Sequence, residues 1–125
     1  MVVVAAFLAS LSLGLSEPPY LGVACSGPQV TTCGRIGVAV WLTTRALGVD
    51  AEVSGSRVRL HAGGLGGRGP TYWQGFVHVE RHQLGLPVYW DGTKPAKTLT
   101  LKLRIRYPTR VAVGSVRVQL RPGWG

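Results

Sequence analysis

The chain is poor in acidic residues, histidine and cysteine. Its 125 residues include five Asp or Glu, three His and two Cys. Catalytic dyads and triads are built from these residue types, and no Ser–His–Asp or Cys–His arrangement is recognisable among so few of them. Two cysteines also fall short of the four ligands of a structural zinc site. This scarcity predicts a protein that is not an enzyme and that needs no cofactor.

Helical periodicity is missing after residue 20. No long segment places apolar side chains three and four residues apart, whereas alternation of apolar and polar residues is frequent. The 18 Gly, the 8 Pro and the many valines favour strands and turns. The length allows one domain with one core. We therefore expect a single all-β domain over residues 25–125, an antiparallel β-sandwich that is Ig-like in the broad sense, with a small closed β-barrel as the alternative.

The alternation also predicts where the strands lie. The clearest pattern covers residues 97–107, where Leu, Ile and Tyr alternate with Thr, Lys and Arg. Residues 35–43 alternate with apolar side chains on both faces, which is typical of a central strand. Residues 49–53 and 57–61 flank a Ser-Gly-Ser turn signal and predict a hairpin. Further strands are expected over residues 72–80, 86–90 and 111–120. In the last of these the apolar positions change parity at Gly114, which predicts a bulge or a tight turn.

The N-terminal run of residues 2–15 is apolar and carries no charge. As a helix it would measure roughly 21 Å, less than the ~30 Å bilayer core. This length is typical of a signal peptide, and residues 14–16 offer a small-x-small cleavage site. No Lys or Arg precedes the run, which is equally typical of the remainder of a longer anchor. We expect residues 1–16 to be a signal peptide or a truncated membrane anchor and 17–24 a linker. The domain would then be extracytoplasmic, either secreted or anchored to the cytoplasmic membrane and facing outward.

The two cysteines, Cys25 and Cys33, come just before the predicted central strand. Their spacing fits neither a zinc knuckle nor a thioredoxin-type redox pair. Lipid attachment at Cys25 would require a branched aliphatic residue three positions earlier, where Gly22 stands. In an exported chain, two such cysteines predict one disulfide bond.

The chain is strongly basic, with 14 Lys and Arg and a formal charge of +9. Such a charge favours anionic cell-envelope polymers or lipid head groups as partners, whereas specific nucleic-acid binding is not expected. If the last two long strands are neighbours, their outward residues form a basic face. The alternative to a binding role is that this face is simply solvated and its charges prevent aggregation. The candidate residues for binding an anionic ligand are Lys102, Arg104, Arg106, Arg117 and Arg121, joined by odd-numbered arginines of the hairpin such as Arg57 and Arg59.

Two other kinds of site are considered. A metal-binding protein or metal-dependent enzyme would use His78 and Glu80 on one strand face, with His61 as a third ligand from elsewhere. A carbohydrate-binding module would use exposed aromatic side chains as stacking platforms. The aromatic candidates are Trp41, Tyr72, Trp73, Tyr89, Trp90 and Trp124. The stretch Gly64–Gly69 matches G-x-G-x-x-G, but Pro70 and a strand pattern follow it, so it indicates a loop instead of a nucleotide site.

The run CGRIGVAVWL over residues 33–42, the upstream Cys25 and the stretch GGLGGRGPTYWQG resemble small secreted or membrane-anchored envelope proteins of high-GC Gram-positive bacteria. The resemblance spans residues 20–80 and implies an N-terminal anchor or signal followed by a β domain. It implies no activity and no functional residues. The sequence thus favours a non-catalytic binding or structural module at the cell envelope.

Overall fold

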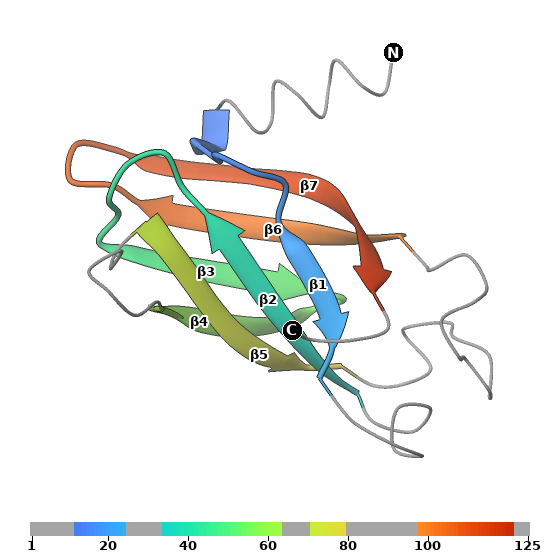
Figure 1. The fold of residues 1–125 in the computed structure, drawn as a ribbon. Helices are drawn as coiled ribbons and strands as arrows, with labels where there is room; N and C mark the ends of the chain where they lie inside the picture. Colours follow the sequence, from blue (N-terminus) through green and yellow to red (C-terminus); the bar gives the residue numbers. More distant parts are fainter. Residues whose placement is uncertain (1–11, 25–33, 64–70, 80–97, 122–125) are drawn as a thin grey trace, which may run out of the picture.

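The computed structural model describes residues 12–24, 34–63, 71–79 and 98–121 (Figure 1). This part of the chain forms seven strands, which close into a barrel in the order β1-β2-β5-β4-β3-β6-β7. The strands are β1 Tyr20–Val23, β2 Arg35–Trp41, β3 Gly48–Val53, β4 Ser56–Ala62, β5 Tyr72–His78, β6 Thr98–Arg106 and β7 Val111–Arg121. The all-β prediction is confirmed. The arrangement is the closed barrel that the sequence left as the alternative, and the expected sandwich is not formed.

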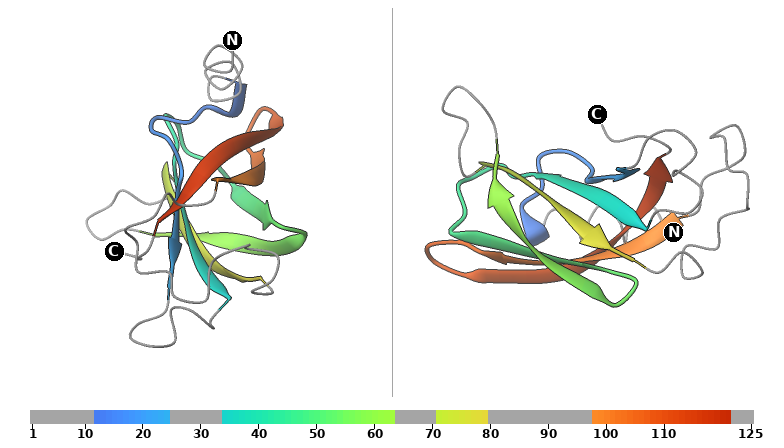
Figure 2. Two further views of the ribbon diagram at one scale, coloured as in Figure 1. Left: turned by 90° about the vertical axis from the view of Figure 1, so that its right-hand side faces the viewer. Right: turned by 90° about the horizontal axis from the view of Figure 1, so that it is seen from below.

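The short strand β1 closes the barrel. It pairs antiparallel with β2 over its whole length and parallel with β7, where Leu21 is the partner of Leu120. Without β1, the sheet would end in two open edges at β2 and β7. Residues 17–24, which the sequence indicated as a linker, therefore contain the strand that joins the two edges (Figure 2).

The predicted hairpin and the strand predicted over residues 97–107 are confirmed. β3 and β4 are joined by Ser54 and Gly55, both with positive φ (50° and 84°), as a two-residue hairpin turn requires. Along β6, Leu99, Leu101, Leu103 and Ile105 are buried and the residues between them are not. The alternation of apolar and polar side chains therefore located both elements from the sequence.

The bulge predicted at Gly114 is wrong. β7 pairs with β6 without interruption, from Arg106 opposite Val111 to Thr98 opposite Gln119. Val111 and Val113 instead face outward, while Ala112 is buried. The small inward residues make room for Leu13, because a Cβ on Gly114 would lie 3.3 Å from the Leu13 side chain. The parity of apolar residues changes here because a side chain from a distant segment fills the core.

The core of the barrel is aliphatic apart from Trp73 and Tyr107, and the described residues include no buried Asp, Glu, Lys, Arg, His, Asn, Gln, Ser or Thr side chain. Leu13 belongs to this core and is fully buried. Backbone hydrogen bonds attach the residues that follow Leu13 to the barrel. The Thr43 N–H donates to the Gly14 carbonyl (3.0 Å), and the Ser16 N–H donates to the Trp41 carbonyl (2.9 Å). Residues 12–16, inside the expected signal or anchor, thus pack as part of the domain.

In the described ranges, no helix has the length and apolar character needed to cross a bilayer. Several predicted features lie outside the described residues. They are Cys25 and Cys33 with their disulfide, the glycine-rich loop over 64–69, the strand over 86–90, and the helix expected in the N-terminal run.

Candidate functional site

Three neighbouring strands bring oppositely charged side chains into register on the outer wall of the barrel. Glu52 of β3 stands between Arg57 of β4 and Lys102 of β6. Two residues along β3, Asp50 stands between Arg59 and Arg104. Side chains at paired positions point to the same face and interact directly. We name the four cations, Arg57, Arg59, Lys102 and Arg104, the basic cluster.

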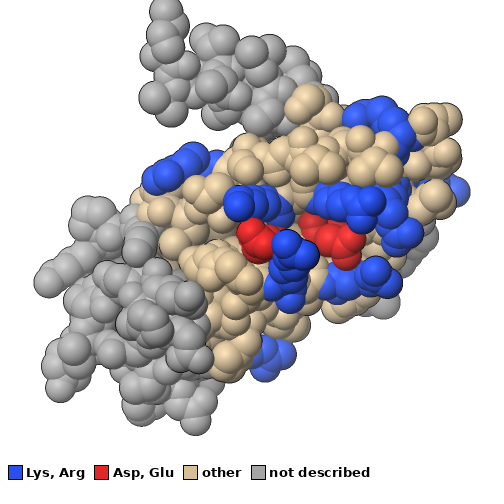
Figure 3. All heavy atoms as spheres, turned by 180° about the vertical axis from the view of Figure 1, so that it is seen from behind, with Lys and Arg blue, Asp and Glu red and all other residues tan. Residues whose placement is uncertain are grey.

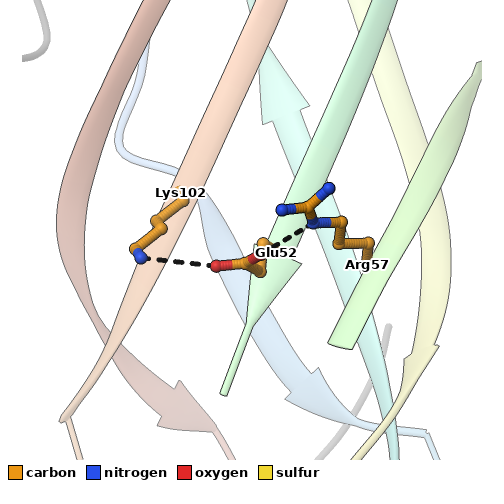
Figure 4. A network of polar contacts seen from close by, with 3 residues as sticks. All are labelled: Glu52, Arg57 and Lys102. Atoms are coloured by element: carbon orange, nitrogen blue, oxygen red, sulfur yellow. Dashed lines mark hydrogen bonds and ion pairs between the residues drawn. The ribbon is translucent and has the colours of Figure 1, made fainter. Parts of the chain in front are cut away.

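The Glu52 carboxylate links three strands through two ion pairs (Figure 4). Glu52 Oε1 accepts a hydrogen bond from Arg57 Nε at 2.9 Å, and its Oε2 lies 3.4 Å from Lys102 Nζ. Asp50 Oδ1 accepts from Arg59 Nε at 3.3 Å. Arg104 is the fourth cation, and no ion pair to it is found within the described ranges. The cluster therefore has a surplus of two positive charges over its two carboxylates.

The cations lie further out than the carboxylates. The side chains of Arg57, Arg59 and Lys102 are 84%, 76% and 63% exposed, whereas those of Glu52 and Asp50 are 21% and 33% exposed. Figure 3 shows the two acids surrounded by lysine and arginine on this face. A ligand that approaches this wall therefore meets guanidinium and ammonium groups before it meets a carboxylate.

The pKa of Glu52 is lowered from its ordinary value. The main cause is the hydrogen bond from Arg57, followed by the hydrogen bond from Lys102. Charged partners favour the ionised carboxylate. Glu52 therefore remains ionised at neutral pH and can pair with both cations.

The cluster lines a shallow, open groove of about 560 Å³, with the aliphatic Val113 on its rim. Guanidinium groups bind carboxylate and phosphate oxygens through paired hydrogen bonds. The other described residues that line the groove are Asp50, Ala51, Glu52, Val58 and Leu103. Its exposed guanidinium and ammonium groups are suited to binding anions.

The residues predicted for an anionic ligand fall into separate places. Lys102 and Arg104 belong to the basic cluster. The guanidinium of Arg106 lies against the backbone of Gly48, near one end of the barrel. Arg117 and Arg121 of β7 line a second hollow, of about 370 Å³, together with Glu17, Pro18, Pro19, Tyr20 and Trp41. The residues of the predicted single face therefore lie in three separate places on the barrel.

The pairing of Asp50 and Glu52 with the cations is not predictable from the sequence pattern. The alternation of residues 49–53 placed Asp50 and Glu52 outward, but their partners depend on the register between β3 and β6. Those strands are far apart in the chain, and register across such a distance is not readable from alternation alone.

The proposed metal ligands are not brought together. His61 of β4 is the partner of Gln74 on β5, and His78 lies four residues further along β5, roughly 13 Å away along the strand. Both histidines are exposed. Across the described ranges, no three His, Cys, Asp or Glu side chains are grouped so that they would hold a metal ion. Glu80 lies outside those ranges.

The aromatic candidates do not form an exposed platform where they are described. Trp73 is in the core at 7% exposure. Trp41 and Tyr72 are half-buried and pack on each other with ring centroids 5.5 Å apart, and the Tyr72 hydroxyl donates to Gln74 Oε1 at 3.0 Å. The remaining candidates, Tyr89, Trp90 and Trp124, lie outside the described residues.

Fold and site together define a small closed β-barrel with a basic outer wall. No family model matches the chain, and no curated protein or solved structure matches it either.

Proposed function

We propose that this protein is a non-catalytic, extracytoplasmic binding module of the cell envelope, and that its basic cluster contacts an anionic polymer. The observation that supports this most strongly is the layering of charge on the barrel wall. Three of the cations are exposed, and the two carboxylates with which they pair are less exposed. The uncharged, apolar sequence of residues 2–11, which precedes the packed residues 12–16, supports the location outside the cytoplasm.

The arrangement suits a polymer better than a small anion. The groove is open and shallow, so it encloses no ligand, but its cations repeat every second residue along β4 and β6, about 7 Å apart. A chain of phosphates, sulfates or carboxylates makes several such contacts at once. Each such contact is weak, and the binding they give together is sensitive to salt.

The test is retention of the full-length protein on a heparin column, eluted with a sodium chloride gradient. One variant carries Arg57→Gln and Arg104→Gln in the basic cluster. The matched control carries Arg117→Gln and Arg121→Gln in the second hollow, so that both lose two positive charges. We expect the cluster variant to elute at clearly lower salt than the control, because its lost charges face the polymer.

Two results would contradict the proposal. If both variants shift equally, retention reflects net charge alone and the cluster is not a site. If the wild-type protein is retained at low salt on neither heparin nor a polyphosphate matrix, it does not bind these anionic polymers and the proposal is wrong. Circular dichroism of both variants, which should match that of the wild type, shows that the barrel remains folded.

A further inference from the structure

One end of the barrel carries exposed aliphatic side chains among arginines. It is formed by the turn between β2 and β3, the turn between β6 and β7, and the start of the described chain (Figure 1). Leu47 is 65% exposed and Val111 is 51% exposed. Arg45 lies two residues before Leu47, and Arg106 is the register partner of Val111. These four residues and Arg110 are named the Leu47 end.

The two turns form one continuous surface. The Leu47 N–H donates to the Arg106 carbonyl at 2.6 Å, which fastens the first turn to β6. Within the second turn, the Tyr107 N–H donates to the Arg110 carbonyl at 2.8 Å, and the Arg110 guanidinium lies over the Tyr107 ring at 4.7 Å. The backbones of the two turns are therefore held next to each other.

The Leu47 end contains no acidic residue. Residues 43–48 and 104–113 include neither Asp nor Glu. Glu17, the described acid closest to the N-terminal segment, lines the hollow between β1 and β7. Asp50 and Glu52 are paired within the basic cluster. An anionic surface that approaches the described part of this end meets arginine, threonine and aliphatic side chains and no carboxylate.

The described chain begins at the same end and is fixed to it. The Arg110 guanidinium donates to the Ser12 carbonyl at 3.1 Å, and the Tyr107 hydroxyl donates to the Leu13 carbonyl at 2.6 Å. Leu13 itself is fully buried. The preceding residues 2–11 are uncharged and, apart from one serine, apolar in sequence. That apolar sequence is thus joined to the Leu47 end directly, with no spacer.

We propose that the Leu47 end rests on an anionic lipid bilayer. Aliphatic side chains beside arginines are what an interfacial contact requires, because the former enter the head-group region and the latter pair with lipid phosphates. A polymer in water would leave Leu47 and Val111 solvated. The adjoining apolar sequence also favours a bilayer as the occupant. This contact does not depend on the polymer site, since the two surfaces share no residue.

The test is flotation of the full-length protein with vesicles that contain phosphatidylglycerol, compared with pure phosphatidylcholine. The variant Arg45→Gln with Leu47→Gln alters the Leu47 end. Its matched control, Arg57→Gln with Val113→Gln, removes one arginine and one exposed aliphatic side chain from the barrel wall. One arginine near an anionic surface accounts for about a fivefold change in affinity. We expect the first pair to lower partitioning at least about tenfold and the control less than about twofold.

Hydrogen exchange of the vesicle-bound wild-type protein gives an independent readout. Amides in residues 43–48 and 107–111 should gain protection on phosphatidylglycerol vesicles, and those of the β3–β4 turn should not. The proposal would be overturned if the two double variants lost vesicle partitioning equally, or if the amides of the Leu47 end gained no protection. A Leu47-end variant that loses heparin retention but keeps vesicle binding would also overturn it, because this end would then bind polymer. Loss of heparin retention in the cluster variant alone leaves the membrane contact intact, which keeps the two proposals distinguishable.

Discussion

Tyr107 is the residue that joins the N-terminal segment to the barrel. Its ring is buried, its hydroxyl donates to the Leu13 carbonyl, and Arg110 covers its outer face. Burial raises the pKa of Tyr107 above its ordinary value, and the nearby Arg110 charge opposes this only in part. The folded protein therefore favours the neutral phenol, the form that donates the hydrogen bond.

The first prediction concerns Tyr107→Phe at two pH values. At pH 8 the variant should lose about 1–3 kcal/mol of unfolding free energy, because the Leu13 carbonyl is left without its donor. A group whose pKa is raised by folding contributes stability that is complete below its unfolded pKa, about 10, and is lost as pH rises through the folded value. The difference between wild type and variant should thus shrink by pH 11, as measured by urea unfolding.

Tyr72→Phe is the control for this prediction. Its hydroxyl donates to Gln74 on the outer wall and contacts no part of the N-terminal segment. We expect a smaller loss at pH 8. A Tyr107→Phe protein as stable as the wild type at pH 8 would show that residues 12–16 are not held as described.

At the scale of elements, the β1–β2 pairing holds together the two ends of the segment that contains both cysteines. Val23 is the partner of Ile36, and the Ala24 N–H donates to the Arg35 carbonyl at 2.9 Å. Cys25 follows this pairing in the chain, and Cys33 precedes it by two residues.

The second prediction is that Cys25 and Cys33 are bonded in protein made in an oxidising compartment. Thiol alkylation of the denatured, unreduced protein should label neither cysteine, and labelling after reduction should modify both. Cys33→Ser should lower the unfolding free energy by about 2–3 kcal/mol, the value expected for a short closed loop. Two reactive thiols in the unreduced protein would contradict the bond.

Elements that depend on interactions between residues close in the sequence were predicted, and features that depend on residues far apart in the sequence were not. β6 and the β3–β4 hairpin depend on alternation and on a local turn, and both were found. β1 closes the barrel but is only four residues long, which is too short for a recognisable alternation of apolar and polar residues. The parity of β7 depends on Leu13 packing against Gly114 across almost the whole chain. Of the basic cluster, the cations were anticipated, but their pairing with Asp50 and Glu52 follows from register, which sequence alone does not define.

At the scale of the whole molecule, charge is divided between a wall and an end of one barrel. The basic cluster lies on the outer faces of β3, β4 and β6, and the Leu47 end caps the barrel where the apolar N-terminal sequence joins it. With that end on a bilayer, the wall remains open to the surrounding medium. In the account proposed here, one small domain touches the membrane and an anionic polymer at the same time.

The central claim is that the basic cluster, and not net charge, binds the polymer, and a pair of charge-matched variants tests it most directly. Glu52→Gln removes the acid between Arg57 and Lys102, whereas Glu17→Gln removes one acid from the other hollow. Both raise the net charge by one. Because the Glu52 ion pairs are exposed, their loss should change stability little. In a salt gradient on heparin, Glu52→Gln should elute at higher salt than both the wild type and Glu17→Gln. Identical elution of the two variants would contradict the account.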